Sequence, residues 1–395
     1  MDLPTLAAAL ADLHLVALED LYIERRRELR VELQSGRIVA RQELSQTGAA
    51  VRRNGTLRSA DGLDRLTLGA LLDVPARALP PTGRLAPAPE PALEAFLAAL
   101  PNSVTAARWR WAWAAVVRPG SAVEQERPQL LELATSDGAR QLTTWPPPPW
   151  WRPAALRRRG SAIPPAGRLR VLLSPAAAGV LLHELVGHPL EGDLAAQPRG
   201  TRLHRNEAVL PLALDLADDP TVAGLPGSFE FDDEGERAAR RLLLHAGRLV
   251  GFLCDRRAAA ALRGEAGNAR RGSVHSLPRP RISNLVADAP DLDPEMLRKD
   301  ARLEVRALAG GVTDPATGLV RLPVRDGVVL RRGRPLGVVG PCTLVATLEA
   351  ARGGLVAAAG PAEPSAEPGW CVKGGEAVAT GSLSPWLLVD GLEAW

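Results

Sequence analysis

Along the first part of the chain, apolar and polar residues follow first the period of a helix and then that of strands. Residues 1–22 carry apolar positions interrupted by acidic ones, which is the pattern of an amphipathic helix. Apolar and charged residues alternate over 29–33, and Ser35-Gly36 follows where a two-residue hairpin turn belongs. Asn54-Gly55 marks a second turn of the same kind. The pattern predicts one helix followed by antiparallel hairpins.

Three tryptophans then recur at period two, Trp109, Trp111 and Trp113, with an arginine between the first two. Such a stripe could stack on bases or on a peptide. Packing of one sheet face against a neighbouring helix explains it better, because these large side chains contribute most when they are buried.

A proline-rich segment separates this region from the rest of the chain. Four successive prolines within residues 144–153 predict an extended polyproline rod that closes the first domain. We place the boundary near residue 165, which divides the chain into domains 1–165 and 166–395.

The second domain begins with a predicted strand at 169–173 and a helix with a clear start. Ser174 is a good N-cap, and Pro175 suits the first helical position. Helical stretches are also predicted at 236–245 and 255–263. The remainder is typical of short strands joined by turns at Ala246-Gly247, Asp326-Gly327 and Arg332-Gly333.

Composition narrows the functional classes. The 48 basic and 45 acidic residues leave a net charge of +3, without the clustered positive charge that nucleic-acid binding requires. No run of 18 uncharged apolar residues occurs, so no membrane-spanning segment is predicted. Three cysteines cannot form a paired disulfide framework, which favours a cytoplasmic protein.

The second helix leads into the sequence LLHELVGHPLEGD, in which His183, Glu184 and His188 form H-E-x-x-x-H. On an ideal helix, residues five apart are separated by roughly 140°, so two imidazoles could not meet on one ion. Gly187 and Pro189 disfavour a regular helix here. We therefore expect the helix to end or to widen, for example through a π-type turn.

Given a metal, neutral imidazoles suit Zn²⁺, and Glu184 is placed to act as general base towards a water. A helix C-terminus that carries histidines for dipole and capping reasons is the alternative. Local spacing does not identify the third ligand, for which the candidates are Glu191, Asp193, Cys254, Cys342 and Cys371. Asp-Asp-Glu at 232–234 could be a second metal site, but a solvated turn is the favoured interpretation.

These residues resemble the TldD/PmbA metallopeptidases. HELVGHPLEGD is similar to the family signature HEAxGHxLEGD, and further similar blocks follow in the same order. These blocks are FDDEG (231–235), GNARRGSVHSLPRPRISN (267–284), GGVTDPATG (310–318) and CVKGGEAVATGSLSP (371–385). The resemblance implies an α+β fold, in which an N-terminal α/β domain with antiparallel hairpins precedes a mainly antiparallel β domain that carries the metal-binding helix.

The resemblance also implies the catalytic member of the family. His183, His188 and Cys371 would bind Zn²⁺, and Glu184 would be the base in the hydrolysis of short or unfolded peptides by metal-activated water. The chain would act as a homodimer or with a TldE/PmbA-like partner. Cys254 and Cys342 would be structural. Val372 stands where the family has glycine, so a conformation that requires glycine is closed to this chain.

Oxyanion or substrate-binding groups are sought among His275, Arg279 and Arg281, because the only tyrosine lies outside the second domain. Asp193 is the candidate acceptor for a ligand imidazole. Two other functions stay open: an inactive regulatory or scaffold subunit of a TldD/TldE-like complex, and a zinc hydrolase of a non-peptide amide. Direct action on DNA topology has no support in the charge balance.

Overall fold

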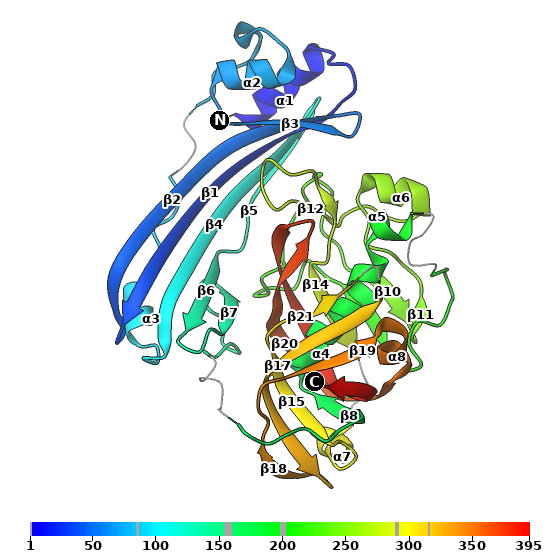
Figure 1. Cartoon of the computed structure of the whole chain (residues 1–395). Helices are drawn as coiled ribbons and strands as arrows, with labels where there is room; N and C mark the ends of the chain where they lie inside the picture. The colour runs from blue at the N-terminus through cyan, green and yellow to red at the C-terminus, as the bar shows by residue number, and fades with distance from the viewer. Residues whose placement is uncertain (1, 84–86, 154–159, 198–202, 289–291, 315–316) are drawn as a thin grey trace.

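The computed structural model describes residues 2–83, 87–153, 160–197, 203–288, 292–314 and 317–395. Strands dominate a mixed fold, with 47% of residues in strands and 17% in helices. The strands form one sheet in the first half and a larger one in the second half (Figure 1). None of the helices in the described ranges is long and apolar enough to cross a membrane.

The first sheet has seven strands, and all of its pairings are antiparallel. Its main order is β3-β2-β1-β4-β6-β7, and β5 pairs with β4. The strands are β1 (Leu18–Gln34), β2 (Arg37–Arg53), β3 (Thr56–Asp61), β4 (Val104–Arg118), β5 (Ser121–Glu126), β6 (Leu130–Thr135) and β7 (Arg140–Thr144). The predicted turns at Ser35-Gly36 and Asn54-Gly55 are confirmed, and all four residues have positive φ.

Short helices lie near the two ends of this sheet: α1 (Leu3–Asp12) and α2 (Arg65–Leu72) at one end, α3 (Glu94–Ala98) at the other (Figure 1). The short helix η1 (Ala76–Ala78) packs beside α2. The helix predicted over 1–22 is therefore too long. Its second half becomes β1 after two residues with positive φ, His14 and Ala17. Trp109 and Trp111 are buried in a core cluster that includes Leu97 of α3, which confirms the packing interpretation of the tryptophan stripe.

The second sheet has twelve strands in the described residues, and five of these strands form a closed ring. The order β21-β19-β17-β15-β8 returns to its start because β8 also pairs with β21. The pairs β15–β8 and β14–β21 are parallel, and the other pairings of this sheet are antiparallel. The strands of the second half, with the separate pair β12 and β13, are β8 (Arg168–Leu173), β9 (Asp215–Asp218), β10 (Arg241–His245), β11 (Arg248–Leu249), β12 (Ala269–Arg270), β13 (Arg279–Pro280), β14 (Asn284–Asp288), β15 (Leu303–Leu308), β16 (Val312–Thr313), β17 (Leu319–Arg331), β18 (Arg334–Val338), β19 (Cys342–Thr347), β20 (Leu355–Lys373) and β21 (Glu376–Ala394).

The helical segments of this half are α4 (Pro175–Leu182), η2 (His183–Gly187), η3 (His188–Leu190), α5 (Gly192–Ala195), α6 (Arg256–Leu262), α7 (Pro294–Arg298) and α8 (Leu348–Gly353). The helix predicted at 255–263 is confirmed as α6. The helix predicted at 236–245 is wrong, because 241–245 pairs with β9 and β11 as β10. A short apolar run between arginines does not distinguish the two structures, and here the pairing decides.

Two of the three turns expected in this half are present. Ala246-Gly247 joins β10 to β11, and Arg332-Gly333 joins β17 to β18. Asp326-Gly327 is not a turn. It lies within β17, at an irregularity in the register with β15, so the chain bulges there instead of reversing.

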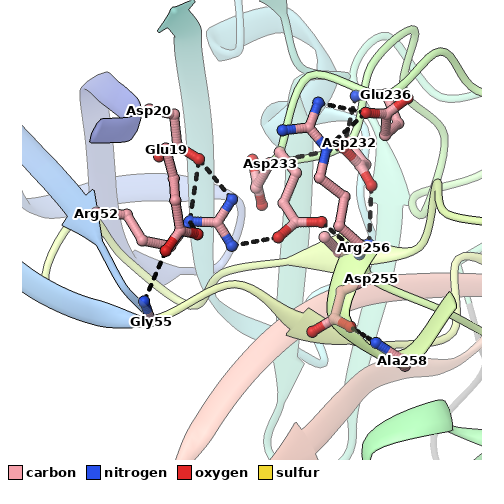
Figure 2. Close-up of polar contacts among 12 residues, drawn as sticks. Glu19, Asp20, Arg52, Gly55, Asp232, Asp233, Glu236, Asp255, Arg256 and Ala258 are labelled. Atoms are coloured by element: carbon pink, nitrogen blue, oxygen red, sulfur yellow. Dashed lines mark hydrogen bonds and ion pairs between the residues drawn. The ribbon is translucent and has the colours of Figure 1, made fainter. Parts of the chain in front are cut away.

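A buried network of charges joins the two halves. The Arg52 guanidinium on β2 bonds to Asp20 on β1, with a shortest distance of 2.5 Å (Figure 2). It also bonds to Glu234 of the second half. Glu234 also accepts a hydrogen bond of 2.7 Å from the backbone N–H of Arg256. The segment 232–234 forms the expected turn, but it is buried, so the expected solvent exposure is wrong. Its carboxylates accept hydrogen bonds from arginine side chains and backbone N–H groups.

This network makes Arg52 a test of how the halves are held together. Arg52→Met would leave Asp20 and Glu234 buried without their shared cation, which we expect to lower the free energy of unfolding by about 3–5 kcal/mol. Urea unfolding measures the change. The control is Arg58→Met, which removes an exposed partner of Asp73 and should leave stability little changed. Equal effects of the two substitutions would contradict the role given to Arg52.

Candidate metal centre

The helix α4 brings the H-E-x-x-x-H motif into the interior of the second half. It starts as predicted, with Ser174 Oγ accepting the N–H of Ala177 and with Pro175 at the first position. The helix is buried and packs against β20, β21 and β15. Gly179 lets it approach β21, since a Cβ there would lie 2.1 Å from Ser382 Oγ.

The helix widens where the motif begins. Residues 183–187 form a π turn, closed by the N–H of His188 on the carbonyl oxygen of His183. The two imidazoles meet with their ring centroids 4.7 Å apart and their planes at 87°. The expected widening is confirmed, but His188 keeps the α conformation despite Pro189. The extra residue in the turn, rather than an end of the helix, turns His188 towards His183.

Gly187 serves close packing. A Cβ on this residue would lie 2.5 Å from Ile282 Cδ1, so the π turn sits directly on the segment that precedes β14. Its φ of −55° is open to any residue. The requirement for glycine is therefore steric.

A third candidate ligand atom comes from near the C-terminal end of the second half. His183, His188 and Cys371 each offer one such atom, and the three atoms lie within 4.8 Å of one another. Cys371 lies on β20 opposite Val378 of β21, close to the turn that joins the two strands. Cys254 and Cys342 are outside this cluster.

The Val372 departure does not disturb this hairpin. Val372 is an ordinary strand residue opposite Ala377, and positive φ begins only at Gly374 and Gly375 in the turn. The glycine of the family pattern is therefore dispensable for the strand conformation seen here.

The donor set fits a divalent cation. Nδ1 of His183 is buried without a hydrogen-bond partner among the described residues, so at least one nitrogen of this ring has no protein partner. Burial, with a smaller effect of His188, holds the pKa of His183 well below its usual range and keeps the imidazole neutral, as a metal ligand must be. Two imidazoles and one thiol are a set typical of zinc.

The Cys371 thiol needs such an ion to lose its proton. Burial and the charge of Glu191 raise the pKa of Cys371 to about 12, against the opposing effect of Arg281. A thiolate is the form that binds a metal, and a bound cation stabilises it directly.

His188 is held by an acidic partner that sequence reasoning did not assign. Glu191 Oε1 lies 3.3 Å from His188 Nδ1, and Lys373 Nζ donates to Glu191 Oε2 at 2.8 Å and to Asp193 Oδ1 at 2.6 Å. Burial disfavours charge on His188, but the hydrogen bond and charge of Glu191 outweigh it and raise the His188 pKa. Asp193 thus contacts Lys373, and Glu191 takes the position expected for Asp193. Glu191 and Lys373 both lie in sequence blocks that carry the family resemblance, LEGD and CVK.

Glu184 is buried and positioned by a separate segment. Thr313 Oγ1, on β16, donates a hydrogen bond of 2.8 Å to Glu184 Oε2. Gly311 packs so closely that a Cβ there would lie 2.7 Å from Glu184 Cγ. The sequence showed the block GGVTD (310–314) without indicating what it does. In the structure this block orients the Glu184 carboxylate.

Of the three substrate-binding candidates, only Arg281 reaches the cluster among the described residues. Arg281 is 1% exposed, and its Nε lies 3.3 Å from Cys371 Sγ while Nη2 donates to the Cys371 carbonyl oxygen. Arg279 is exposed on β13. His275 instead contacts the first sheet, through Ser59 on β3 and Gln46 on β2.

A cavity of about 830 Å³ lies between the two sheets, along the β20–β21 hairpin that carries Cys371. Its wall includes residues of β1 and β4 on one side, and Gly310 and Val372 on the other. Gly310 precedes the glycine that packs on Glu184, and Val372 follows Cys371. The cavity therefore reaches segments next to the candidate centre, and His183, Glu184, His188 and Cys371 are not among the residues that line it.

Comparisons with known proteins identify a family and a fold that this chain resembles. The family model described as the PmbA/TldA metallopeptidase C-terminal domain matches residues 166–394. A protein of Archaeoglobus fulgidus named metalloprotease is 34% identical over 229 residues, which are 57% of this chain and 52% of that protein. A protein of Saccharolobus solfataricus named zinc metalloprotease TldD homolog is 31% identical over 123 residues, 31% of this chain and 28% of that protein.

The fold of the described residues is also found among solved structures. TldE from Thermococcus kodakarensis superposes with a TM-score of 0.62 at 14% sequence identity, over 95% of this chain and 96% of that chain. At this identity the similarity concerns the fold alone. The chain spans about half the length of the curated relatives it matches.

Lys373 provides a test of the positioning network. Lys373→Met would leave Glu191 without its cation and free to move away from His188, so we expect the affinity for a divalent cation to fall about 10- to 100-fold. Competition with a chromophoric chelator measures that affinity. The only other lysine, Lys299, is exposed, and Lys299→Met is the matched control. Unchanged affinity in Lys373→Met would show that Glu191 holds His188 without help.

Proposed function

The chain belongs to the PmbA/TldD metallopeptidase family, and from that premise we propose that it is a zinc-dependent peptidase acting on short or unfolded peptides. The observation that carries the proposal is the convergence of the metal-ligating atoms of His183, His188 and Cys371 within 4.8 Å, beside the buried carboxylate of Glu184. The relatives named as metalloproteases support the class of reaction.

Zinc is the cation that best suits this donor set. Two imidazoles and a thiolate are its usual ligands, and three protein ligands leave one coordination position open. When bound, zinc acidifies water to a pKa of about 7 and polarises a carbonyl group. The zinc metalloprotease name of the Saccharolobus solfataricus relative agrees with this choice.

The proton transfers fall to Glu184. Its Oε2 is held by Thr313, so among the described residues Oε1 is the oxygen left to take a proton from the attacking water. The same carboxyl can then give that proton to the leaving amine. Arg281 and Glu191 act on the ligands rather than on the substrate, because their contacts are with Cys371 and His188.

The cavity between the sheets is the proposed path for substrate. A volume of about 830 Å³ lies within the range of small-ligand sites, which a few residues of extended chain can enter and a folded domain cannot. This size supports short or unfolded peptides as the substrate class.

We also propose that the chain acts as a dimer, either with itself or with a TldE-like chain. The similarity to TldE of Thermococcus kodakarensis is compatible with such a pair but concerns the fold alone. The metal-ligating cluster supports a catalytic role over an inactive scaffold. Comparing the hydrolysis of peptides with that of small non-peptide amides separates the peptidase from a general amide hydrolase.

Metal content tests the ligand set without a known substrate. We expect about one zinc per chain in the purified wild-type protein and its loss in Cys371→Ala, because two imidazoles alone hold the ion weakly. The control is Cys254→Ala, which removes a buried thiol outside the cluster and should leave the zinc in place. Well-folded wild-type protein that takes up no zinc would overturn the proposal.

Cleavage of unfolded peptides tests the base. Glu184→Gln keeps the size of the side chain but cannot accept the proton, so kcat should fall about 10²- to 10⁴-fold while zinc content stays constant. Thr313→Val should lower kcat by a smaller factor, because the carboxylate remains but loses its orientation. Peptide turnover by Glu184→Gln at the wild-type rate would assign the base to another group.

A further inference from the structure

The cavity between the sheets carries an excess of positive charge. Nine arginines and five acidic side chains line it. Most of these arginines have a carboxylate partner: Arg26 with Glu24, Arg27 with Glu43, Arg108 and Arg110 with Glu28, Arg127 with Asp233, Arg140 with Glu132, and Arg271 with Asp20. Within the described residues, Arg270 and Arg325 are the two cavity arginines that form no ion pair.

Arg270 is the more unusual of the two because it is only 7% exposed. Its Nη1 donates to the carbonyl oxygens of Ile282 and Ala379, each at 2.7 Å, and the Phe229 ring centroid lies 5.6 Å away. In the part of the chain that the structure describes, its other N–H groups make no hydrogen bond. Carbonyl oxygens and a ring face satisfy donors but do not neutralise a buried cation.

The groups around Arg270 also disfavour its positive charge. Burial, together with the charge of Arg127, lowers the pKa of Arg270 to about 10. Glu367 also lines the cavity, but burial raises the pKa of its carboxyl, which favours the neutral form. The charge of Asp233 acts in the opposite direction, but Asp233 forms no ion pair with Arg270. An anion that entered the cavity would therefore find in Arg270 a cation without a paired carboxylate.

The location of Arg270 links it to the candidate metal centre. Ala379, one of its carbonyl partners, pairs across the β20–β21 hairpin with Trp370, the residue before Cys371. Ile282, the other partner, follows Arg281, which contacts the Cys371 sulfur. A group bound by Arg270 thus lies beside the metal-ligating hairpin and within the cavity.

We propose that Arg270 binds a carboxylate of the substrate and so selects peptides that present an anionic group next to the bond to be cleaved. This inference rests on the proposed peptidase function and names the substrate class. A guanidinium suits a carboxylate because it can present two parallel N–H donors. In a peptide, the carboxylate is either the chain terminus or an acidic side chain.

Binding measured without cleavage separates this inference from the peptidase proposal. Zinc-loaded Glu184→Gln protein would be titrated calorimetrically with three pentapeptides: all-alanine with a free C-terminal carboxylate, the same peptide with a C-terminal amide, and the amide with one alanine replaced by glutamate. We expect at least one carboxylate peptide to bind about 10- to 100-fold more tightly than the neutral amide. Which one does so identifies the source of the carboxylate.

When Arg270→Met is added to the same protein, the ratio of the affinities for the carboxylate peptide and the neutral amide should fall close to one. Adding Arg140→Met is the matched control, because Arg140 lines the same cavity but already has a partner, and the preference should persist. Adding Arg270→Lys keeps the charge without the planar fork and should keep a reduced preference, which covers the case in which the methionine variant does not fold.

Two results would overturn the inference: equal or absent binding of all three peptides by the Glu184→Gln protein, or an unchanged preference after Arg270→Met. Peptide cleavage by the wild type is measured separately. If the wild type cleaves peptides but Arg270→Met leaves the binding preference unchanged, this inference is wrong and the peptidase proposal is unaffected.

Discussion

Two imidazoles five residues apart cannot face one ion from a regular helix, and this chain meets that constraint by widening the helix. Much of the second half supports the widened turn. The π turn at 183–187 places one extra residue in a single turn, which brings the rings to a centroid distance of 4.7 Å. Such a turn is less favourable than a regular helix, so the surroundings must hold it. The burial of α4 and the contact of Gly187 with Ile282 supply that support.

Bringing a thiol, two imidazoles and carboxylates together in the interior creates a second demand, for balance of charge. Glu191 is fully buried between His188 and Lys373, and Arg281 lies against the Cys371 sulfur. Glu191, His188 and Cys371 are acceptable there because an opposite charge or a hydrogen-bond partner accompanies each of them, whereas His183 is buried in its neutral form. The β20–β21 hairpin supplies both Cys371 and Lys373, so one element delivers a ligand and the cation that steadies another ligand. The same principle operates away from the centre, where Arg52 joins the two sheets through Asp20 and Glu234.

The sequence predicted the features that depend on local patterns. Hairpin turns at Ser35-Gly36 and Asn54-Gly55, the capped start of α4 and the widening at H-E-x-x-x-H all follow from neighbouring residues. Features set by distant contacts were missed or misjudged. The run at 241–245 became a strand because β9 and β11 offer pairing, and the acidic segment 232–234 is buried because arginines of the first sheet meet it. The contacts of Thr313 with Glu184, and of Lys373 with Glu191 and Asp193, join segments more than 100 residues apart.

The ring of strands in the second half has a consequence for the order of events during synthesis. β21 pairs with β8 to close the ring, and its partner β20 carries Cys371, whereas both histidines lie on the helix directly after β8. A ribosome that adds about 5–20 residues per second reaches Cys371 some 10 to 40 s after His188. During that interval the nascent chain holds two of the three ligand positions and an open sheet. The proposed three-ligand site and the closed ring thus become possible together and late, so an incomplete chain cannot carry the assembled candidate centre.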